Sequence, residues 1–316
     1  EGHTMHETAE EAQEFTLTML KVYEDFYRDT LAIPAVVGKK TEKEKFAGAE
    51  ATYTIEPMMH NGVALQGGTS HYFGDGFTKA FDITFTDREN KLRHPHQTSW
   101  GVSTRMIGAV IMVHGDDNGL VLPPKIAPIQ VVIVPVAQHK PGVLEKAREL
   151  QAQLSETFRV KLDDSDNSPG WKYAQYEMQG VPLRLEIGPK DMEKNQCVLV
   201  RRDSGDKVFI SLDELETAVP ATLDAIHDGL YQKAKKNLED NSFTAETWEQ
   251  VKEVLERNNG GFVKTKWCGS LDCELAMKEK VGVSSRCMPL EQSGTEGVCP
   301  ICGKKCTTDI YWGVAY

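Results

Sequence analysis

The chain has 316 residues, with 47 Asp and Glu against 36 Lys and Arg, so its formal net charge is −11. This length predicts two or three domains, and a 40% share of hydrophobic residues is typical of a folded protein. An acidic chain cannot hold nucleic acid by bulk charge alone, although a local basic site is compatible with it. The longest apolar run, Met106 to Val113, is shorter than the about 20 residues of a membrane-spanning helix.

The first 125 residues combine a long helix with a β-rich region. Apolar residues recur at steps of three and four from His6 to Thr30, which predicts an amphipathic helix. Asn61-Gly62 predicts a tight turn between two of the β-type segments that follow, and these segments indicate an antiparallel sheet. Residues 104–116 are apolar on nearly every side and predict a buried helix. The β-type segments are residues 32–37, 52–59, 63–68 and 80–87.

A Pro-rich stretch, Leu122 to Gln130, cannot continue a helix and marks the first domain boundary. The alternation of strand and helix patterns after it predicts a small α/β domain. A third unit follows from about Thr244, and it carries the cysteine cluster. The predicted elements are strands at 131–136, 159–164, 182–188 and 197–202, and helices at 142–158, from about 211, and at 245–258.

The seven cysteines are odd in number and crowd toward the C-terminus, unlike the disulfide framework of a secreted protein. A metal site in a reducing compartment, and therefore a cytoplasmic protein, is the better interpretation. Four thiolates can close a tetrahedral zinc site with no open position for a substrate, so the expected role is structural. Cys287 and Cys306 are rival ligands outside the paired spacings, and Cys197 is expected in the core. The predicted ligands are Cys268, Cys273, Cys299 and Cys302.

Residues 65–71, LQGGTSH, place two glycines and two hydroxyl residues beside a Gln and a His. Glycines let a ligand approach the backbone closely, and the polar side chains offer directional hydrogen bonds. This sequence is also typical of an ordinary turn, and spacing alone does not decide between a turn and a ligand-binding segment.

Thr98 to Val136 resembles the third signature motif of class II aminoacyl-tRNA synthetases, in the form found in prolyl-tRNA synthetases. The opening EGHT resembles the end of the second motif, and KTEKEKFAGAE and QGGTSH resemble the proline-pocket segments. Further on, residues 168–191 resemble the anticodon-binding domain, and CPICGKK resembles the zinc-containing C-terminal domain of the archaeal and eukaryotic type. The resemblance therefore spans essentially the whole chain.

The resemblance implies that L-proline is activated with ATP, together with Mg²⁺, to prolyl adenylate and then transferred to the 3′ end of proline tRNA. Arg105 would contact ATP phosphate, which suits a planar, permanently charged guanidinium, and would be the catalytic residue. A surface ion pair is its alternative role. Gln66 and Thr69 match ATP-contacting positions. The positions that match the proline pocket are Glu1, His3, Phe46, His71, Ser99 and Trp100.

In the second domain the resemblance places Glu177, Arg184, Lys190 and Lys207 where the family meets the anticodon guanines. Arg and Lys can donate to guanine O6 and N7, and a carboxylate can accept from its N1 and N2. Exposed charged side chains are also what any solvated sheet edge carries, so residue type alone does not identify them as RNA contacts.

The chain departs from the family at its start, which falls inside the second motif. We expect a preceding segment or a cleavage, because the first motif, through which the family forms homodimers, and the second-motif arginine are not seen. Tyr316 matches a tail whose carboxylate comes near the catalytic domain in the family. A small apolar pocket cannot strongly exclude smaller residues, so activation of alanine and cysteine is expected to be detectable. Between Glu1 and Trp100 there is no room for the editing domain of bacterial-type enzymes, so any correction is expected to come from another protein.

The favoured hypothesis is an ATP-dependent proline–tRNA ligase. The alternatives are an inactive tRNA-binding module with the same fold and a zinc-ribbon nucleic-acid binder, which would explain the cysteines only. The expected architecture is a multidomain α+β and α/β protein: a class II antiparallel sheet with helices in residues 1–125, an α/β anticodon-binding domain in 126–235, and a zinc-binding α/β domain in 236–316.

Overall fold

The computed structural model describes residues 1–257 and 260–316. They form two compact units: residues 1–29, 33–109 and 235–316 make the first, and residues 30–32 and 110–234 make the second. Within the described residues, no helix has both the length and the apolar composition needed to cross a bilayer.

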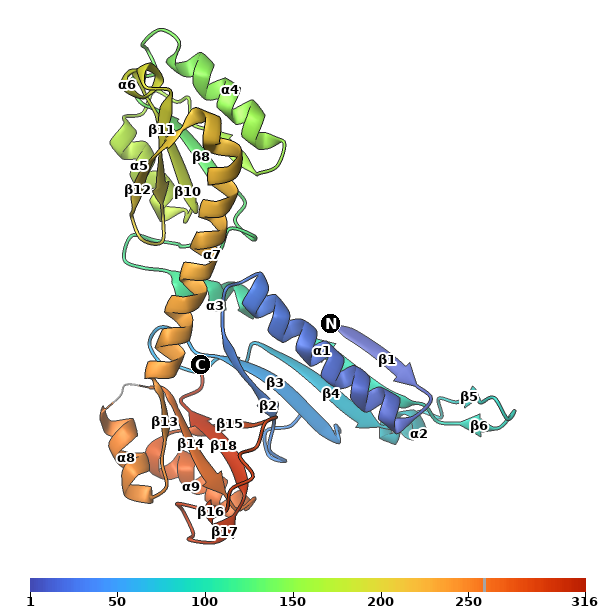
Figure 1. The fold of residues 1–316 in the computed structure, drawn as a ribbon. Coiled ribbons are helices and arrows are strands. Elements are labelled where there is room, and N and C mark those ends of the chain that lie inside the picture. The colour runs from blue at the N-terminus through green and yellow to red at the C-terminus, as the bar shows by residue number, and fades with distance from the viewer. Residues whose placement is uncertain (258–259) are drawn as a thin grey trace. The chain divides into compact units, whose positions relative to one another are not determined.

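The first unit is built on a nine-stranded sheet in the order β1-β7-β4-β3-β2-β15-β18-β14-β13 (Figure 1). All neighbouring pairs are antiparallel except β13 and β14, which are parallel. From its N-terminal part come β1 (Gly2–His6), α1 (Ala9–Asp29), β2 (Ala35–Lys39), β3 (Ala51–Pro57), β4 (Gly68–Gly74), α2 (Gly76–Ala80), β5 (Phe85–Thr86), β6 (Leu92–Arg93), β7 (His96–Gly101) and the start of α3 (Arg105–His114).

The C-terminal part of the chain completes this sheet and adds two helices beside it. Its cysteine-bearing region has a core around the perpendicular rings of Trp267 and Trp312. The tail returns to the first part of the unit, because the Tyr316 amide donates to the Ala64 carbonyl at 3.0 Å. The elements are β13 (Ser242–Thr244), α8 (Trp248–Arg257), β14 (Phe262–Trp267), α9 (Leu271–Val281), β15 (Ser284–Pro289), β16 (Gly297–Val298), β17 (Lys305–Cys306) and β18 (Thr308–Gly313).

The second unit has a five-stranded sheet in the order β12-β11-β10-β8-β9 (Figure 1). Its main core lies between one face of the sheet and helices α4 and α7, and α5 packs on the other face through Tyr176. Its elements are β8 (Val131–Pro135), α4 (Val143–Ser155), β9 (Val160–Leu162), α5 (Pro169–Met178), β10 (Leu183–Ile187), α6 (Pro189–Glu193), β11 (Gln196–Arg201), β12 (Lys207–Ser211), a 3₁₀ turn (Leu212–Glu214) and α7 (Leu215–Asp240), which continues into the first unit.

The predicted architecture of an antiparallel sheet with helices and an α/β unit is confirmed, with four local corrections. The helix expected at 104–116 is not buried all round, because Ile107 is 59% exposed. The segment 80–87 forms only a two-residue strand after α2, and residues 63–67 are not a strand. The helix expected over 245–258 begins at Trp248, and its predicted end at Asn258 lies outside the described residues.

Candidate functional site

A cavity of about 350 Å³ lies in the first unit, on the sheet face opposite α1. It is lined by seven of the nine residues that the sequence suggested for ATP and proline, although these come from five separate stretches of the chain. Gly67 and Gly68, Thr52, Glu44 and residues 101–103 complete the wall. The seven residues are Glu1, Phe46, Gln66, Thr69, His71, Ser99 and Arg105.

Strand register explains why the polar residues of this cavity converge. His3 pairs with Ser99 across β1 and β7, Ser99 with His71 across β7 and β4, and His71 with Thr52 across β4 and β3. Directly paired residues place their side chains on the same face of a sheet. These four side chains therefore form one row across four strands.

Two predicted proline-pocket residues do not line the cavity. His3 belongs to the row but lies beyond the cavity wall, where its ring is 3.2 Å from the Glu1 carboxylate. Trp100 follows Ser99 and so faces the other side of the sheet, where its ring packs against Phe15 of α1 at a centroid distance of 6.4 Å. A Cβ on Gly2, the strand partner of Trp100, would collide with the indole ring.

His71 and Phe46 form the inner wall with the help of Thr52, which the sequence did not suggest. The Thr52 hydroxyl accepts a hydrogen bond from the Phe46 amide at 3.0 Å and lies 2.9 Å from His71 Nδ1. The Phe46 and His71 ring centroids are 5.1 Å apart. Burial lowers the pKa of His71 to about 4, so the imidazole is neutral at pH 7. This end of the cavity suits a compact, partly apolar ligand.

The other end of the cavity is polar and carries a permanent positive charge. Arg105 is the first residue of α3, and its Nη1 donates to the Gln66 carbonyl at 3.3 Å while the side chain stays exposed. A Cβ on Gly67 would meet the Tyr27 hydroxyl at 2.9 Å, and one on Gly68 would meet Val102 at 2.8 Å. The two glycines are therefore needed for packing as well as for backbone access. A guanidinium, an amide and hydroxyls at a helix N-terminus suit phosphate oxygens.

In the second unit the structure brings two of the four suggested RNA-contacting residues together. Arg184 is held by Glu186 at 2.9 Å and by Glu177 at 3.4 Å, and its guanidinium lies 4.1 Å from the centre of the Tyr173 ring. Glu177 and Arg184 line a cavity of about 220 Å³. Arg202, which the sequence did not suggest, lines the same cavity and makes a bidentate pair with Asp116 at 2.6 and 2.7 Å.

Lys190 and Lys207 lie outside that cavity. Lys190 is exposed on the short helix α6. Lys207 pairs with Val200, which pairs with Arg184, so both cations project from the same sheet face. Phe209, two residues after Lys207, shares this face and is 64% exposed. An exposed aromatic ring beside cationic residues on one sheet face is a surface on which an unpaired base can stack.

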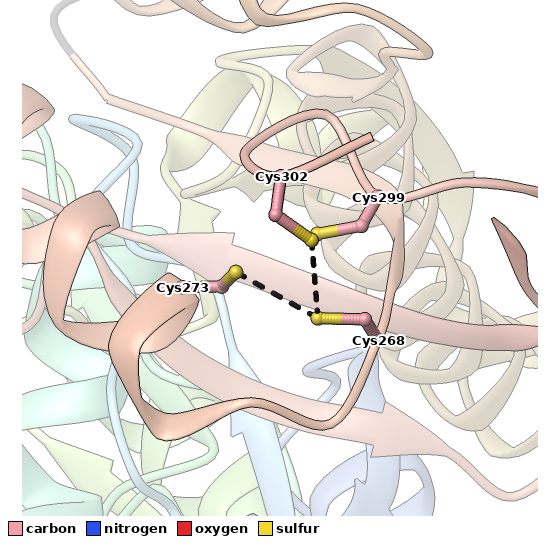
Figure 2. A group of neighbouring side chains, drawn as sticks. All are labelled: Cys268, Cys273, Cys299 and Cys302. Carbon is pink, nitrogen blue, oxygen red and sulfur yellow. Dashed lines mark hydrogen bonds between the residues drawn. The ribbon is translucent and has the colours of Figure 1, made fainter. Parts of the chain in front are cut away.

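The four suggested metal ligands form one cluster, in which the ligand atoms lie within 4.8 Å of one another. Figure 2 shows the thiols turned toward a common centre, with Cys268 Sγ 3.7 Å from Cys273 Sγ and 3.6 Å from Cys302 Sγ. Zinc–sulfur bonds of about 2.3 Å in a tetrahedron require sulfur–sulfur distances of about 3.8 Å. The donor set and its spacing therefore fit zinc.

Local backbone geometry shapes this cluster. Cys268 follows β14, Cys273 lies in the first turn of α9, and Cys299 and Cys302 flank a turn that ends at Gly303, whose φ is +74°. A hydrogen bond from the Lys304 amide lowers the pKa of Cys302 to about 7, which favours the thiolate that binds metal.

The other three cysteines are not among the four clustered ligands. Cys287 is fully buried in β15, where burial raises its pKa to about 12. Cys306 lies in β17 and is not one of the four clustered ligands. Cys197 is in the core of the second unit, as predicted.

Comparison with known proteins gives matches along nearly the whole chain. Residues 1–114 match the tRNA synthetase class II core domain (G, H, P, S and T), residues 130–222 the anticodon binding domain, and residues 248–316 the prolyl-tRNA synthetase C-terminal domain. Over all 316 residues the chain is 60% identical to the proline–tRNA ligase of Ruminiclostridium cellulolyticum and 59% identical to proline–tRNA ligase 2 of Bacillus cereus. The proline–tRNA ligase of Clostridium botulinum is 58% identical, and the chain spans 66% of the length of each of these relatives.

Proposed function

Because this chain belongs to the prolyl-tRNA synthetase family of class II enzymes, we propose that its protein is a proline–tRNA ligase. In this reaction the proline carboxylate attacks the α-phosphate of ATP, pyrophosphate leaves, and the 3′ end of proline tRNA then displaces AMP from the prolyl adenylate. The observation that carries the proposal is the convergence of Gln66, Thr69, His71 and Arg105 on one cavity. An inactive tRNA-binding module would not require that convergence.

Each end of the cavity suits one of the two small substrates. We assign proline to the end with Phe46, His71 and Ser99, because a neutral imidazole and an aromatic ring suit a compact pyrrolidine. The Glu1 carboxylate can compensate the charge of the secondary ammonium. ATP with Mg²⁺ belongs at the end with Arg105, whose guanidinium can neutralise charge on the phosphates during the displacement. The position of Trp100 under α1 supports a role in packing rather than in contact with proline.

We assign recognition of the anticodon to the sheet face of the second unit. Glu177 and Arg184 offer complementary hydrogen-bonding groups for guanine edges, and Lys207 and Phe209 extend the same face toward β12. Single-stranded loops are read by edge contacts and stacking, which a local basic patch can supply on an acidic protein. Lys190, on the short helix α6, would contact the RNA from outside this sheet face.

For the four cysteines we propose one structural Zn²⁺ per chain. All four positions of a tetrahedral ion would be filled by sulfur, which leaves none for a substrate. Native mass spectrometry of the folded protein tests this, and a folded, metal-free sample would contradict it. We further propose that the protein acts in the cytoplasm as a homodimer, as the resemblance implies, and sedimentation analysis tests the dimer.

The ligase assignment is tested by proline-dependent pyrophosphate exchange. The chain is assayed alone and joined to the remaining third of a relative such as the Clostridium botulinum ligase, which the resemblance predicts to precede Glu1. We expect exchange in the joined protein and its loss, by about a hundredfold or more, in Arg105→Ala. Lys91→Ala, an exposed cation outside the cavity, is the matched control and should keep full activity. A joined protein that binds tRNA but exchanges with no amino acid would favour the inactive module.

A further inference from the structure

A buried hydrogen-bond cluster crosses the seam where the class II core meets the cysteine-bearing part of the first unit. Strand β15 pairs with β2 at Met288–Lys39 and Pro289–Gly38. Beside this pairing, one carboxylate oxygen of Glu274 accepts hydrogen bonds from the Thr41 hydroxyl, at 2.8 Å, and from the Ser285 hydroxyl.

The carboxylate of Glu274 depends on these two hydroxyl donors. Glu274 is 3% exposed, and Thr41 and Ser285 are each 1% exposed. In the described part of the chain, no lysine or arginine forms an ion pair with Glu274. The N-terminal end of α9, where Glu274 lies in the first turn, adds a favourable dipole. A buried carboxylate that loses a donor bears a large desolvation cost, so the positions of Thr41 and α9 depend on each other.

On one side of this cluster lies the metal centre. Cys273 directly precedes Glu274 in the same helical turn, and Cys268 lies five residues before Cys273. Its Sγ is 3.7 Å from that of Cys273, within the four-cysteine cluster. An ion bound by these thiolates would fix the first turn of α9 and with it the carboxylate of Glu274.

On the other side lies the substrate cavity. Thr41 begins the loop 41–50, and its carbonyl accepts hydrogen bonds from the amides of Glu44, at 3.2 Å, and Lys45, at 2.9 Å. Glu44 and Phe46 in this loop line the cavity. Thr41 is therefore the fixed end of a loop whose next residues meet the proposed substrates.

We propose that Glu274 is a positioning residue through which metal bound at the four cysteines holds the loop 41–50 in place for substrate. The inference rests on the proposed function, because it takes zinc as the metal and proline with ATP as the ligands of the cavity. Coupling between two binding sites is reciprocal. Zinc binding therefore strengthens substrate binding, and proline with ATP strengthens zinc binding by the same factor; we expect this to show as slower transfer of zinc to a chelator.

The test uses the joined protein described above and three variants. Thr41→Val keeps the shape of the side chain but removes the hydroxyl that Glu274 accepts from, and Glu274→Ala removes the acceptor. Glu274→Gln keeps an oxygen that can accept the hydrogen bonds of both hydroxyls, and it is expected to preserve the position of the loop 41–50. The matched control is Thr54→Val, which also removes a buried hydroxyl, bonded at 2.8 Å to the carboxylate of Glu56 rather than to Glu274.

Three quantities are measured: zinc content, amide hydrogen exchange over residues 43–50, and the rate of zinc transfer to a chromogenic chelator with and without proline and ATP. In Thr41→Val and Glu274→Ala we expect full zinc content, exchange at 43–50 faster by about fivefold or more, and a rise of similar size in the KM for proline with little change in kcat. Substrates should slow zinc transfer in the unmodified protein and not in these two variants. Glu274→Gln and Thr54→Val should behave like the unmodified protein.

The outcomes separate this inference from the function on which it rests. Unchanged loop exchange and unchanged proline KM in both Thr41→Val and Glu274→Ala, with zinc bound, would overturn the coupling and leave the ligase and zinc proposals intact. If Thr54→Val lost protection from hydrogen exchange to the same degree, the effect would be one of general destabilisation. That result would also overturn the proposed coupling. Absence of zinc from the folded, unmodified protein would refute the metal assignment itself.

Discussion

The protonation state of His71 follows from its place in the sheet. The ring is 8% exposed, beside Phe46 and Phe73, and burial lowers its pKa from 6.5 to about 4, although the Glu1 carboxylate acts in the opposite direction. A neutral ring can offer one donor and one acceptor to a ligand. The cavity therefore keeps its hydrogen-bonding pattern across the physiological pH range.

This burial makes the stability of the protein depend on pH. A histidine whose pKa is lowered by folding takes up its proton first in the unfolded chain, so its effect is to destabilise the fold as the pH falls from about 6.5 toward about 4. We expect His71→Gln to lose less stability than the unmodified protein between pH 7 and pH 5, as measured by urea midpoints at both values. An equal loss in the two proteins would show that folding does not lower the pKa of His71.

At the scale of single residues, the sequence predicts contacts between residues that are near each other in the chain. Cys299 and Cys302 could be paired because one turn brings both thiols together. The contact between His71 and Thr52 could not be predicted, because it depends on the register of β3 against β4. Ser99 and Trp100 were both predicted for the proline pocket, but adjacent strand residues face opposite sides of a sheet, and only the position of α1 shows which side holds the cavity.

Among the elements, the seam between β2 and β15 holds a cluster of buried charges. Glu56 is fully buried in β3 and accepts from Lys40 at 2.7 Å and from Arg286 at 2.9 Å. Gly38 is needed here, because a Cβ would meet the Met288 carbonyl oxygen at 2.3 Å. Removing one partner of a buried ion pair leaves a charge without compensation and costs far more than removing an exposed one.

We therefore expect Arg286→Ala to destabilise the first unit by about 3 kcal/mol. The matched control is Arg93→Ala, because the Arg93 side chain is 56% exposed where it pairs with Asp87 at 3.0 Å, and its loss should cost about 1 kcal/mol or less. Urea unfolding followed by tryptophan fluorescence compares them. Similar losses of unfolding free energy in both variants would mean that the buried pair at the seam stabilises the fold no more than a surface ion pair does.

The elements also show where sequence patterns were reliable. The helix expected from His6 to Thr30 is present as α1, and its buried residues recur at steps of three and four as the pattern predicts. They are Ala12, Thr16, Leu20, Tyr23 and Tyr27. Helix α5 was not predicted from its pattern, although Ser168 caps it and Pro169 occupies its first turn. Its buried Lys172 interrupts the apolar periodicity on which the prediction depends.

At the scale of the whole molecule, the order of domains along the chain differs from the division into compact units. Residues 236–316 are predicted as a zinc-binding domain, and in the structure residues 235–316 share a continuous sheet and one compact unit with residues 1–29 and 33–109. Contacts such as Arg286 to Glu56 join residues 230 positions apart, and no local pattern encodes them. The family resemblance supplied the domain types and their order, whereas the shared sheet and the link through Glu274 required coordinates.

The architecture also bears on fidelity. Residues 1–100 are occupied by the sheet, α1, α2 and the β5–β6 hairpin, and they hold no further domain of the kind that edits mischarged tRNA between the second and third motifs of bacterial-type relatives. A pocket made for proline cannot strongly reject a smaller residue, because a missing methylene changes binding by about 1–3 kcal/mol. Within residues 1–100, discrimination against smaller amino acids in the proposed ligase therefore depends on the fit of this cavity.

We expect the joined protein to activate alanine and cysteine, with kcat/KM lower than for proline by about 10- to 200-fold for each methylene lost. The measurement is pyrophosphate exchange with each amino acid over a range of concentrations. Glycine, which offers still less apolar surface, is the graded control and should be weaker than alanine. A cavity of fixed shape loses contacts step by step as the amino acid becomes smaller. If exchange with alanine and cysteine stayed at background level while exchange with proline was strong, this prediction would be wrong. The smaller amino acids would then be rejected by a mechanism other than cavity size.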